Sequence, residues 1–306
     1  MVSVAEEAGE AVAGGTVLVR RRALGDVVLL GAITAAVPPP VTVVTEAPYV
    51  PLVRRLRGVD RALAWGTSRP GGRVIDLQRD LKTLRAFPRA RRLRKHSVAR
   101  RLRLWGWGRG RPAVGELYAR AAGVVGVPPP WLRLPEAKRA ALALIPGAST
   151  PLKAPALGLL LEVGRQWDGP VVILGGPGDA PRVDALAADL LAVRSSPAVA
   201  IAEAGFEATL EALPQIRVAV GGDTGLMHLA AASGARTVWL AGPTHPDDGF
   251  LRWDSGVVIE RALPCRPCTL HRGTSCRLGD RRCMELELEP LLRAVEGAGA
   301  LGAADR

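Results

Sequence analysis

The chain has 306 residues, of which 48% are hydrophobic, and it carries a formal net charge of +12. This length allows two domains of ordinary size, each with its own core, and the apolar content excludes a disordered protein. No stretch reaches the roughly 18–20 apolar residues that a membrane-spanning helix needs, and the acidic tail at 1–15 lacks the basic head of a secretory signal. We therefore expect a globular, cytoplasmic protein.

After the tail, a strand is predicted over 17–20, then a glycine turn that carries Asp26, then a helix. Asp26 would either cap that helix or project beyond the end of the strand as a general base. Strands that alternate with helices are typical of a parallel sheet. Three more strands are predicted in this half, at 41–45, 62–64 and 74–77, with a helix over 113–125.

A basic stretch from Leu81 to Gly115 holds twelve Lys or Arg residues and no Asp or Glu, with Trp105 and Trp107 inside it. Three roles fit this composition: phosphate contacts and stacking on nucleic acid, binding to an anionic membrane surface, or a solvated helix face. Because no nucleic-acid-binding motif accompanies the stretch, we expect no specific nucleic acid.

A proline-rich run at 127–136 predicts the linker between an N-terminal domain at 16–126 and a C-terminal domain at 137–306. In such doubly wound sheets, ligands bind at the carboxyl ends of the strands. The second domain is predicted to contain strands at 141–145, 171–174 and 199–202 and helices at 156–166, 180–192 and 206–213.

The segment 217–246 is the most informative part of the chain. It predicts a strand over 217–220, a Gly-Gly-Asp-Thr-Gly turn, a helix that begins at Asp223, and a strand over 237–240. With Asp223 as the N-cap, free amides at the positive end of the helix dipole would face an anion such as phosphate. These amides belong to Thr224, Gly225 and Leu226.

His228 lies about one turn into this helix, where it would either donate to a bound anion or pack as a structural histidine. Strand–glycine–helix turns without any ligand are also common, so the pattern alone leaves both interpretations open.

All four cysteines form one block with the spacing C-x₂-C-x₇-C-x₆-C. In a cytoplasmic protein such a block favours a structural zinc ion over two disulfides, although the spacing is not that of a zinc ribbon. Free or redox-active thiols and an iron–sulfur cluster are the alternatives. The block consists of Cys265, Cys268, Cys276 and Cys283.

Taken together, the motifs resemble glycosyltransferase family 9, the ADP-heptose:lipopolysaccharide heptosyltransferases. Its R-x-x-x-L-G-D signature is matched by Arg20, Leu24, Gly25 and Asp26, and its D-[ST]-G-x-x-H-x-A-A motif by Asp223, Thr224, Gly225, His228, Ala230 and Ala231. The further matches, in the right order, are V-I-D-L-Q at 74–78, P-G-A-S at 146–149, I-L-G-G-P at 173–177 and V-x-L-x-G-P-T-x-P at 238–246.

The resemblance implies a GT-B type α/β fold, with two Rossmann-like doubly wound domains facing a central cleft. It implies inverting, metal-independent transfer of a heptose or related sugar from an ADP-sugar to a phosphorylated lipopolysaccharide-core-like glycolipid or surface glycan, with peripheral contact at the inner leaflet. Asp26 would be the base, and the donor would be bound by Ser149, Thr150, Lys153 and the residues from Asp223 to His228. The acceptor side would include Arg22, Gly25, Arg92, Arg94 and Lys95.

The chain departs from the family pattern in three places. Arg22 stands where a small hydroxylated or acidic residue is usual, 30–32 reads Leu-Gly-Ala instead of a Thr-Thr-Pro-like run, and the usual lysine–x–tryptophan–proline is reduced to Lys153-Ala154-Pro155. Two other hypotheses therefore stay open: a catalytically degenerate module that binds a nucleotide or a glycan, and a basic nucleic-acid-associated protein.

Overall fold

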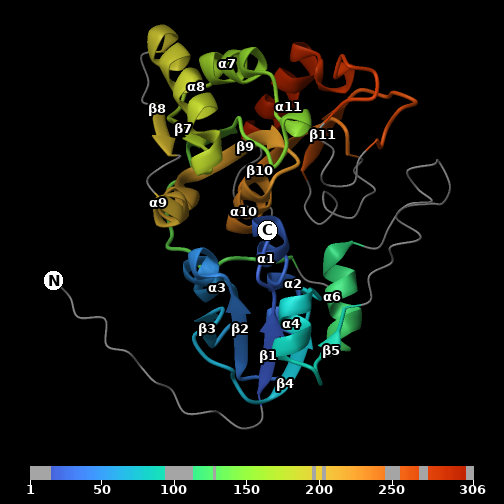
Figure 1. Cartoon of the computed structure of the whole chain (residues 1–306). Helices are drawn as coiled ribbons and strands as arrows, with labels where there is room; N and C mark the ends of the chain where they lie inside the picture. Colours follow the sequence, from blue (N-terminus) through green and yellow to red (C-terminus); the bar gives the residue numbers. More distant parts are fainter. Residues whose placement is uncertain are drawn as a thin grey trace.

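The computed structural model describes residues 15–93, 113–126, 129–194, 198–201, 205–244, 256–268 and 275–300. Within this part of the chain the N-terminal half forms a five-stranded parallel sheet in the order β3-β2-β1-β4-β5 (Figure 1). Its strands are β1 Thr16–Val19, β2 Val41–Thr45, β3 Arg61–Ala64, β4 Arg73–Asp76 and β5 Arg91–Arg92. The helices of this half are α1 Leu24–Val28, α2 Gly31–Thr34, α3 Val50–Arg55, α4 Leu81–Ala86 and α6 Val114–Ala122, with the 3₁₀ turn η1 Ala47–Tyr49.

Over the same described residues, the C-terminal half forms a six-stranded sheet in the order β11-β10-β9-β6-β7-β8, again with parallel pairs. The strands are β6 Ala141–Ile145, β7 Val171–Leu174, β8 Ala198–Ile201, β9 Ile216–Gly222, β10 Arg236–Ala241 and β11 Val257–Glu260. The α-helices are α7 Leu157–Gln166, α8 Ala180–Val193, α9 Gly205–Ala212, α10 Gly225–Ser233 and α11 Leu288–Ala300. The 3₁₀ turns are η2 Pro151–Lys153, η3 Pro177–Asp179, η4 Leu213–Gln215 and η6 Arg282–Met284.

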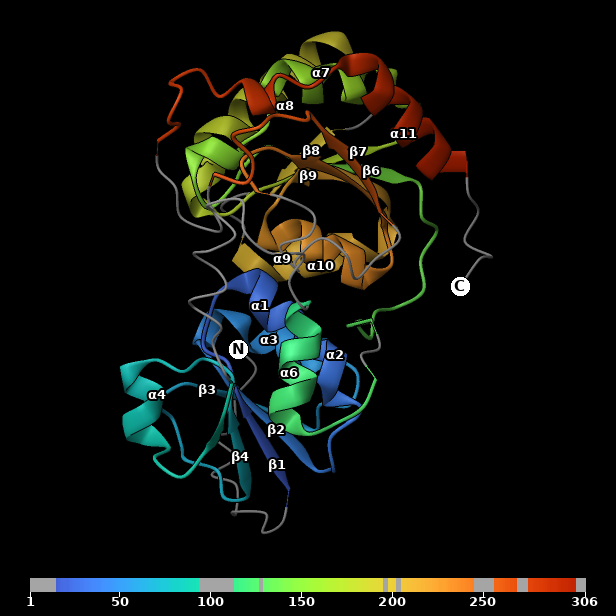
Figure 2. The ribbon, with the colours of Figure 1, turned by 90° about the vertical axis from the view of Figure 1, so that its right-hand side faces the viewer.

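Strand β6 shows why this sheet is buried on both faces. Its side chains alternate, so that Leu142 and Leu144 pack with α7, α8 and α11, whereas Ala143 and Ile145 face the side of α9 and α10. Figure 2 shows α7, α8 and α11 over the outer face and α9 and α10 between the two sheets. The inner helices thereby bring the second sheet onto the first half of the molecule.

Each half has an apolar cluster of its own, and a further cluster is common to both halves. One cluster runs from Leu18 and Val28 in the N-terminal half to Met227 and Trp239 in the C-terminal half. Leu132, inside the predicted linker, is also buried in this cluster and forms a bridge with Leu56. The α1 and α10 helices pack against each other between the two sheets, and their apolar residues belong to this common cluster.

Two predicted helix starts were wrong in detail. Thr224, not Asp223, is the N-cap of α10, because the Thr224 hydroxyl accepts from the Leu226 amide. Asp26 neither caps α1 nor precedes it in a turn: the N-cap is Ala23, and Asp26 lies inside the first helical turn. The C-terminal end of α10 follows the common rule, with Gly234 in the left-handed region at φ 93°.

Among the described helices, none is long and apolar enough to cross a membrane.

Candidate functional site

Both sheets reverse their strand order at one point, and loops that carry predicted site residues begin there. In the N-terminal sheet the reversal lies between β1 and β4, and in the C-terminal sheet it lies between β6 and β9. Open α/β sheets bind ligands outside the carboxyl ends of the strands at such switch points. The loop after β6 carries Lys153, the loop after β9 carries Asp223, and the segment after β1 carries Asp26.

An ion pair joins the two loops of the C-terminal switch point. Lys153 Nζ lies 2.7 Å from Asp223 Oδ2, with side-chain exposures of 5% and 11%. The Asp223 carboxylate makes this contact, and the neighbouring Thr224 is the cap of α10. The pair holds a primary ammonium beside the amino end of a helix, where an anion is favoured.

Two buried hydroxyls border the same edge of the sheet. Thr150 Oγ1, after β6, and Thr244 Oγ1, after β10, have no hydrogen-bond partner in the described part of the chain. A buried hydroxyl without a partner costs free energy, and a polar ligand would supply what is missing. Ser149, beside Thr150, is exposed. Thr150 and Thr244 are therefore candidate ligand donors, and Thr244 was not among the predicted site residues.

The amino end of α10 is less open than we had predicted. The Leu226 amide donates to Thr224 Oγ1, so it is not a free donor. Gly225 packs against α1, because a methyl group added there would lie 2.7 Å from Leu24 Cβ and 2.8 Å from the Gly25 nitrogen. An anion at this helix end would therefore lie on the side that faces Asp223 and not between the two helices.

His228 and Gly25 meet at the junction of the two halves. The His228 side chain is buried and tilts against Trp239, with ring centroids 5.0 Å apart. A methyl group on Gly25 would lie only 2.9 Å from His228 Cδ2. Gly25, predicted on the acceptor side, therefore serves the close approach of α1 to α10, and His228 packs in that contact.

Asp26 lies at the N-terminal switch point with two polar partners. Its carboxylate forms an ion pair with Arg20, and the Tyr118 hydroxyl lies 3.2 Å from the Asp26 carbonyl and 3.4 Å from Asp26 Oδ1. Burial acts to lower the pKa of Arg20, but the nearby Tyr118 and Asp26 outweigh it and the pKa is raised. Burial raises the pKa of Tyr118, so this phenol stays protonated and can donate.

A side-chain network holds the segment after β1. The Gln78 side chain, which follows β4, accepts from the backbone N–H groups of Arg21 and Arg22, each at 3.2 Å. The Arg21 guanidinium bonds to Glu46 and Asp80 and lies over the Trp65 ring at 4.6 Å. These contacts fix the chain between Arg20 and Asp26, and they explain why V-I-D-L-Q occurs after the first glycine motif.

The predicted acceptor residues separate into different environments. Arg22 is exposed, whereas Arg92 donates to the carbonyls of Phe87 and Pro88 at 2.8 Å and so supports its own loop. Arg94 and Lys95 lie outside the described residues, as do Trp105 and Trp107.

The four cysteine side chains are free thiols within electrostatic reach of one another. Burial raises the pKa of Cys283, and Cys268, Cys276 and Cys265 raise it further. Among the described residues, however, no group of three or more His, Cys, Asp or Glu side chains is arranged so that it could hold a metal ion. The zinc site remains a prediction.

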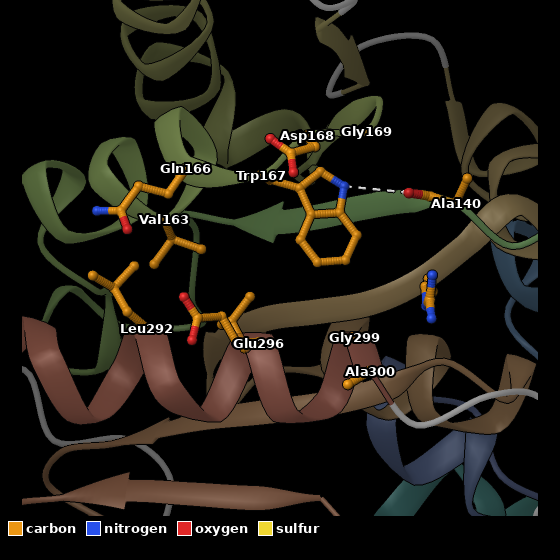
Figure 3. Close-up of a pocket in the computed structure, with 12 residues that line it drawn as sticks. Ala140, Val163, Gln166, Trp167, Asp168, Gly169, Leu292, Glu296, Gly299 and Ala300 are labelled. Carbon is orange, nitrogen blue, oxygen red and sulfur yellow. Dashed lines mark hydrogen bonds between the residues drawn. The ribbon is translucent and has the colours of Figure 1, made fainter.

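A pocket of about 580 Å³ lies at the opposite, amino-terminal edge of the C-terminal sheet (Figure 3). Trp167 forms one wall and donates to the Ala140 carbonyl at 3.2 Å, and Leu292, Glu296 and Gly299 of α11 form another. None of the predicted site residues lines it. Because doubly wound sheets bind ligands at the other edge, we do not assign the reaction to this pocket.

Two doubly wound parallel sheets with their switch points in adjoining halves define the GT-B class of glycosyltransferase fold, as the motifs had predicted. Residues 130–274 match the family model described as Glycosyltransferase family 9 (heptosyltransferase). The chain therefore carries a glycosyltransferase family 9 domain over residues 130–274, and this domain supports glycosyltransferase activity.

Three solved structures share the fold. A glycosyl transferase family 9 protein from Veillonella parvula DSM 2008 is 15% identical, with a TM-score of 0.67 over 93% of this chain and 97% of that one. The E. coli ADP-heptose LPS heptosyltransferase II is 16% identical, with a TM-score of 0.65 over 93% and 98%. The E. coli heptosyltransferase WaaC, solved with ADP, is 17% identical, with a TM-score of 0.60 over 92% and 99%. None of the curated protein sequences compared with the chain matches it.

Proposed function

We propose that the protein transfers a heptose or a related sugar from an ADP-linked donor to a phosphorylated glycolipid or surface glycan, with inversion and without a catalytic metal. The carrying observation is that Asp26 and the Lys153–Asp223 pair lie at the switch points of two sheets that α1 and α10 hold together. The E. coli WaaC structure contains ADP, which supports a nucleotide diphosphate donor here.

In the proposed reaction Asp26 accepts the proton of the acceptor hydroxyl while that oxygen attacks the anomeric carbon. The bond from this carbon to the diphosphate oxygen breaks, and the electron pair leaves with the nucleotide diphosphate. Arg20 and Tyr118 orient the Asp26 carboxylate through the contacts described above. A base placed in this way typically contributes about 10²–10⁴-fold in rate.

The leaving diphosphate gains negative charge as the bond breaks. Lys153 and the amino end of α10 are positive groups already held in place, and such preorganised donors lower a barrier without reorganisation. Lys153 is paired with Asp223, so its ammonium would contact the diphosphate and the Asp223 carboxylate at the same time. The carboxylate would hold the ammonium in position. The proposed chemistry therefore draws its positive charge from the chain itself.

The contact with a glycolipid-bearing surface is proposed from α4. Leu81 and Leu84, one turn apart, are 61% and 36% exposed, and Lys82 and Arg85 lie on the same helix. Exposed apolar residues beside basic ones are typical of peripheral membrane contact. We expect co-sedimentation with vesicles that contain anionic lipid, weaker for Leu81→Ser and absent with neutral vesicles. Equal binding to both vesicle types would contradict the electrostatic part of this proposal.

The donor is tested by thermal shift with ADP, GDP, UDP and CMP. A ligand at about 100 times its Kd stabilises the folded state by about 2.7 kcal/mol, so a selective rise in Tm with ADP is expected. A rise with another nucleotide instead would change the donor, and no rise with any nucleotide would contradict the donor site.

The base is tested by ADP release from an ADP-sugar in the presence of acceptor. Asp26→Asn keeps the size of the side chain but should lower kcat by about 10²–10⁴-fold while ADP binding is retained. Turnover near the wild-type rate would show that Asp26 is not the base. Binding of ADP by the wild type without turnover on any sugar nucleotide would instead indicate a nucleotide-binding module.

A further inference from the structure

The loop that carries the predicted donor residues is held by two arginines from other parts of the fold. We call residues 146–155 the donor loop. Arg182, from α8, donates to the carbonyl of Pro146 at 2.9 Å and to that of Pro155. Arg281, from the cysteine segment, donates to the Ala154 carbonyl at 2.9 Å, next to Lys153. Both guanidiniums donate to backbone carbonyls, so these hydrogen bonds hold the conformation of the loop whatever side chains it carries.

The cysteine segment, here residues 265–268 and 275–284, also holds the turn after β10. Arg266 donates to the carbonyls of Gly242 and Thr244, and the Cys268 amide donates to the Pro243 carbonyl at 3.2 Å. Met284 packs so closely on Gly242 that a methyl group there would lie 2.0 Å from Met284 Sδ. The segment therefore touches both the donor loop and the turn that carries Thr244.

Arg281 links the thiols to this framework. Cys276 begins the turn that leads to Arg281, in which the Gly279 N–H donates to the Cys276 carbonyl at 3.2 Å. The backbone N–H groups of Arg281, Leu278 and Gly279 favour negative charge on the Cys276 sulfur and so lower the pKa of this thiol. The Arg281 side chain reaches the donor loop, 127 residues away in sequence. One residue thus has its backbone against a cysteine sulfur and its guanidinium against the loop of Lys153.

The arrangement brings two like charges together. Burial lowers the pKa of Arg182, and the nearby Arg281 lowers it further. Removing the Arg281 guanidinium would lose a hydrogen bond but relieve this repulsion, so the two effects on the stability of the unliganded protein oppose each other. For the affinity of a ligand that binds the loop, relief of this repulsion does not offset the loss of the hydrogen bond.

We propose that Arg281 is a positioning residue for nucleotide binding: it sets the donor loop from the cysteine segment, so that affinity for a nucleoside diphosphate depends on the contact of Cys276 with Arg281. This inference rests on the proposed function. Loss of the contact removes one of the two arginines that hold the loop of Lys153.

The test measures ADP affinity by titration calorimetry and donor KM and kcat by ADP release, with circular dichroism as a check of folding. Arg281→Ala should weaken ADP binding about tenfold, which corresponds to about 1.4 kcal/mol, and raise KM with little change in kcat. Arg281→Lys should recover part of the affinity. Arg282→Ala is the matched control, because that neighbouring side chain is 51% exposed and pairs with Asp280.

Coupling to the thiol is tested by a double-mutant cycle. Cys276→Ala should weaken ADP binding in the wild type but add little in the Arg281→Ala background. Equal ADP affinity in Arg281→Ala and wild type, or additive effects in the cycle, would overturn the inference. If Arg281→Ala does not fold, Arg281→Gln must show the same rise in KM. Failure of the wild type itself to bind any nucleotide would overturn the proposed function, and this inference with it.

Discussion

The substitution Gly222→Ala tests how closely the donor loop packs on the end of β9. A methyl group at Gly222 would lie 2.4 Å from the Lys153 carbonyl oxygen and 3.7 Å from Pro155 Cδ. Ordinary van der Waals contact begins at 3.4 Å, so the loop or the strand must move by about 1 Å. The obstacle is backbone, which cannot rotate away as a flexible side chain could.

Two consequences follow from this displacement. Overpacking of this kind costs about 1–3 kcal/mol, which corresponds to a fall in Tm of roughly 2–12 °C. A shift of about 1 Å in positioned groups costs about 10²-fold in rate, so kcat/KM for the donor should fall by that order and ADP affinity should fall with it.

The assay combines a thermal melt with ADP titration and steady-state kinetics. Gly178→Ala is the control, because Gly178 also follows a strand of this sheet but a methyl group there meets nothing within 4 Å. If Gly222→Ala kept the Tm and the ADP affinity of the wild type, the donor loop would not rest on Gly222 and the geometry argued for Lys153 would be wrong.

Three further predictions concern the buried charges, the tyrosine and the thiols. Asp223→Asn should cost about 3–5 kcal/mol in denaturant unfolding, because it leaves the Lys153 ammonium buried and without its carboxylate; a loss below 1 kcal/mol would contradict the pair. Since burial raises the pKa of Tyr118 in the folded state, its contribution is present below the unfolded value of about 10 and is lost as pH rises above it, so Tyr118→Phe should reduce the alkaline fall in stability between about pH 10 and 12. Elemental analysis of the purified protein should find about one zinc per chain, absent from a Cys265→Ser/Cys268→Ser variant, and a metal-free wild type with four titratable thiols would contradict the zinc prediction.

The strands and the motif positions were predictable from sequence because their causes are local. Runs such as 141–145 and 171–174 are apolar and are bounded by turn residues, and the structure places β6 and β7 at these bounds. The glycine motifs after β1 and β9 mark places where the backbone must pass close to a neighbour, which Gly25 and Gly225 do.

Which residue caps α10 could not be read from the sequence. Asp223 and Thr224 are both good cap residues. Which of them caps α10 depends on Lys153, which lies 70 positions earlier and binds the Asp223 carboxylate. Once the fold brings that ammonium to Asp223, the carboxylate forms the ion pair and the hydroxyl takes the cap. A contact that only the tertiary structure creates therefore decides which of two residues with similar capping propensity caps the helix.

The same reason applies to the partners of the candidate base and of the donor loop. Tyr118 reaches Asp26 across 92 positions, and Arg281 reaches Ala154 across 127. No spacing rule connects such pairs, since they meet only when α6 packs against α2 and when the cysteine segment returns to the edge of the second sheet. The sequence by itself determined the fold class and the positions of the motifs, and the packing of the two sheets decided which partners hold the candidate site residues in place.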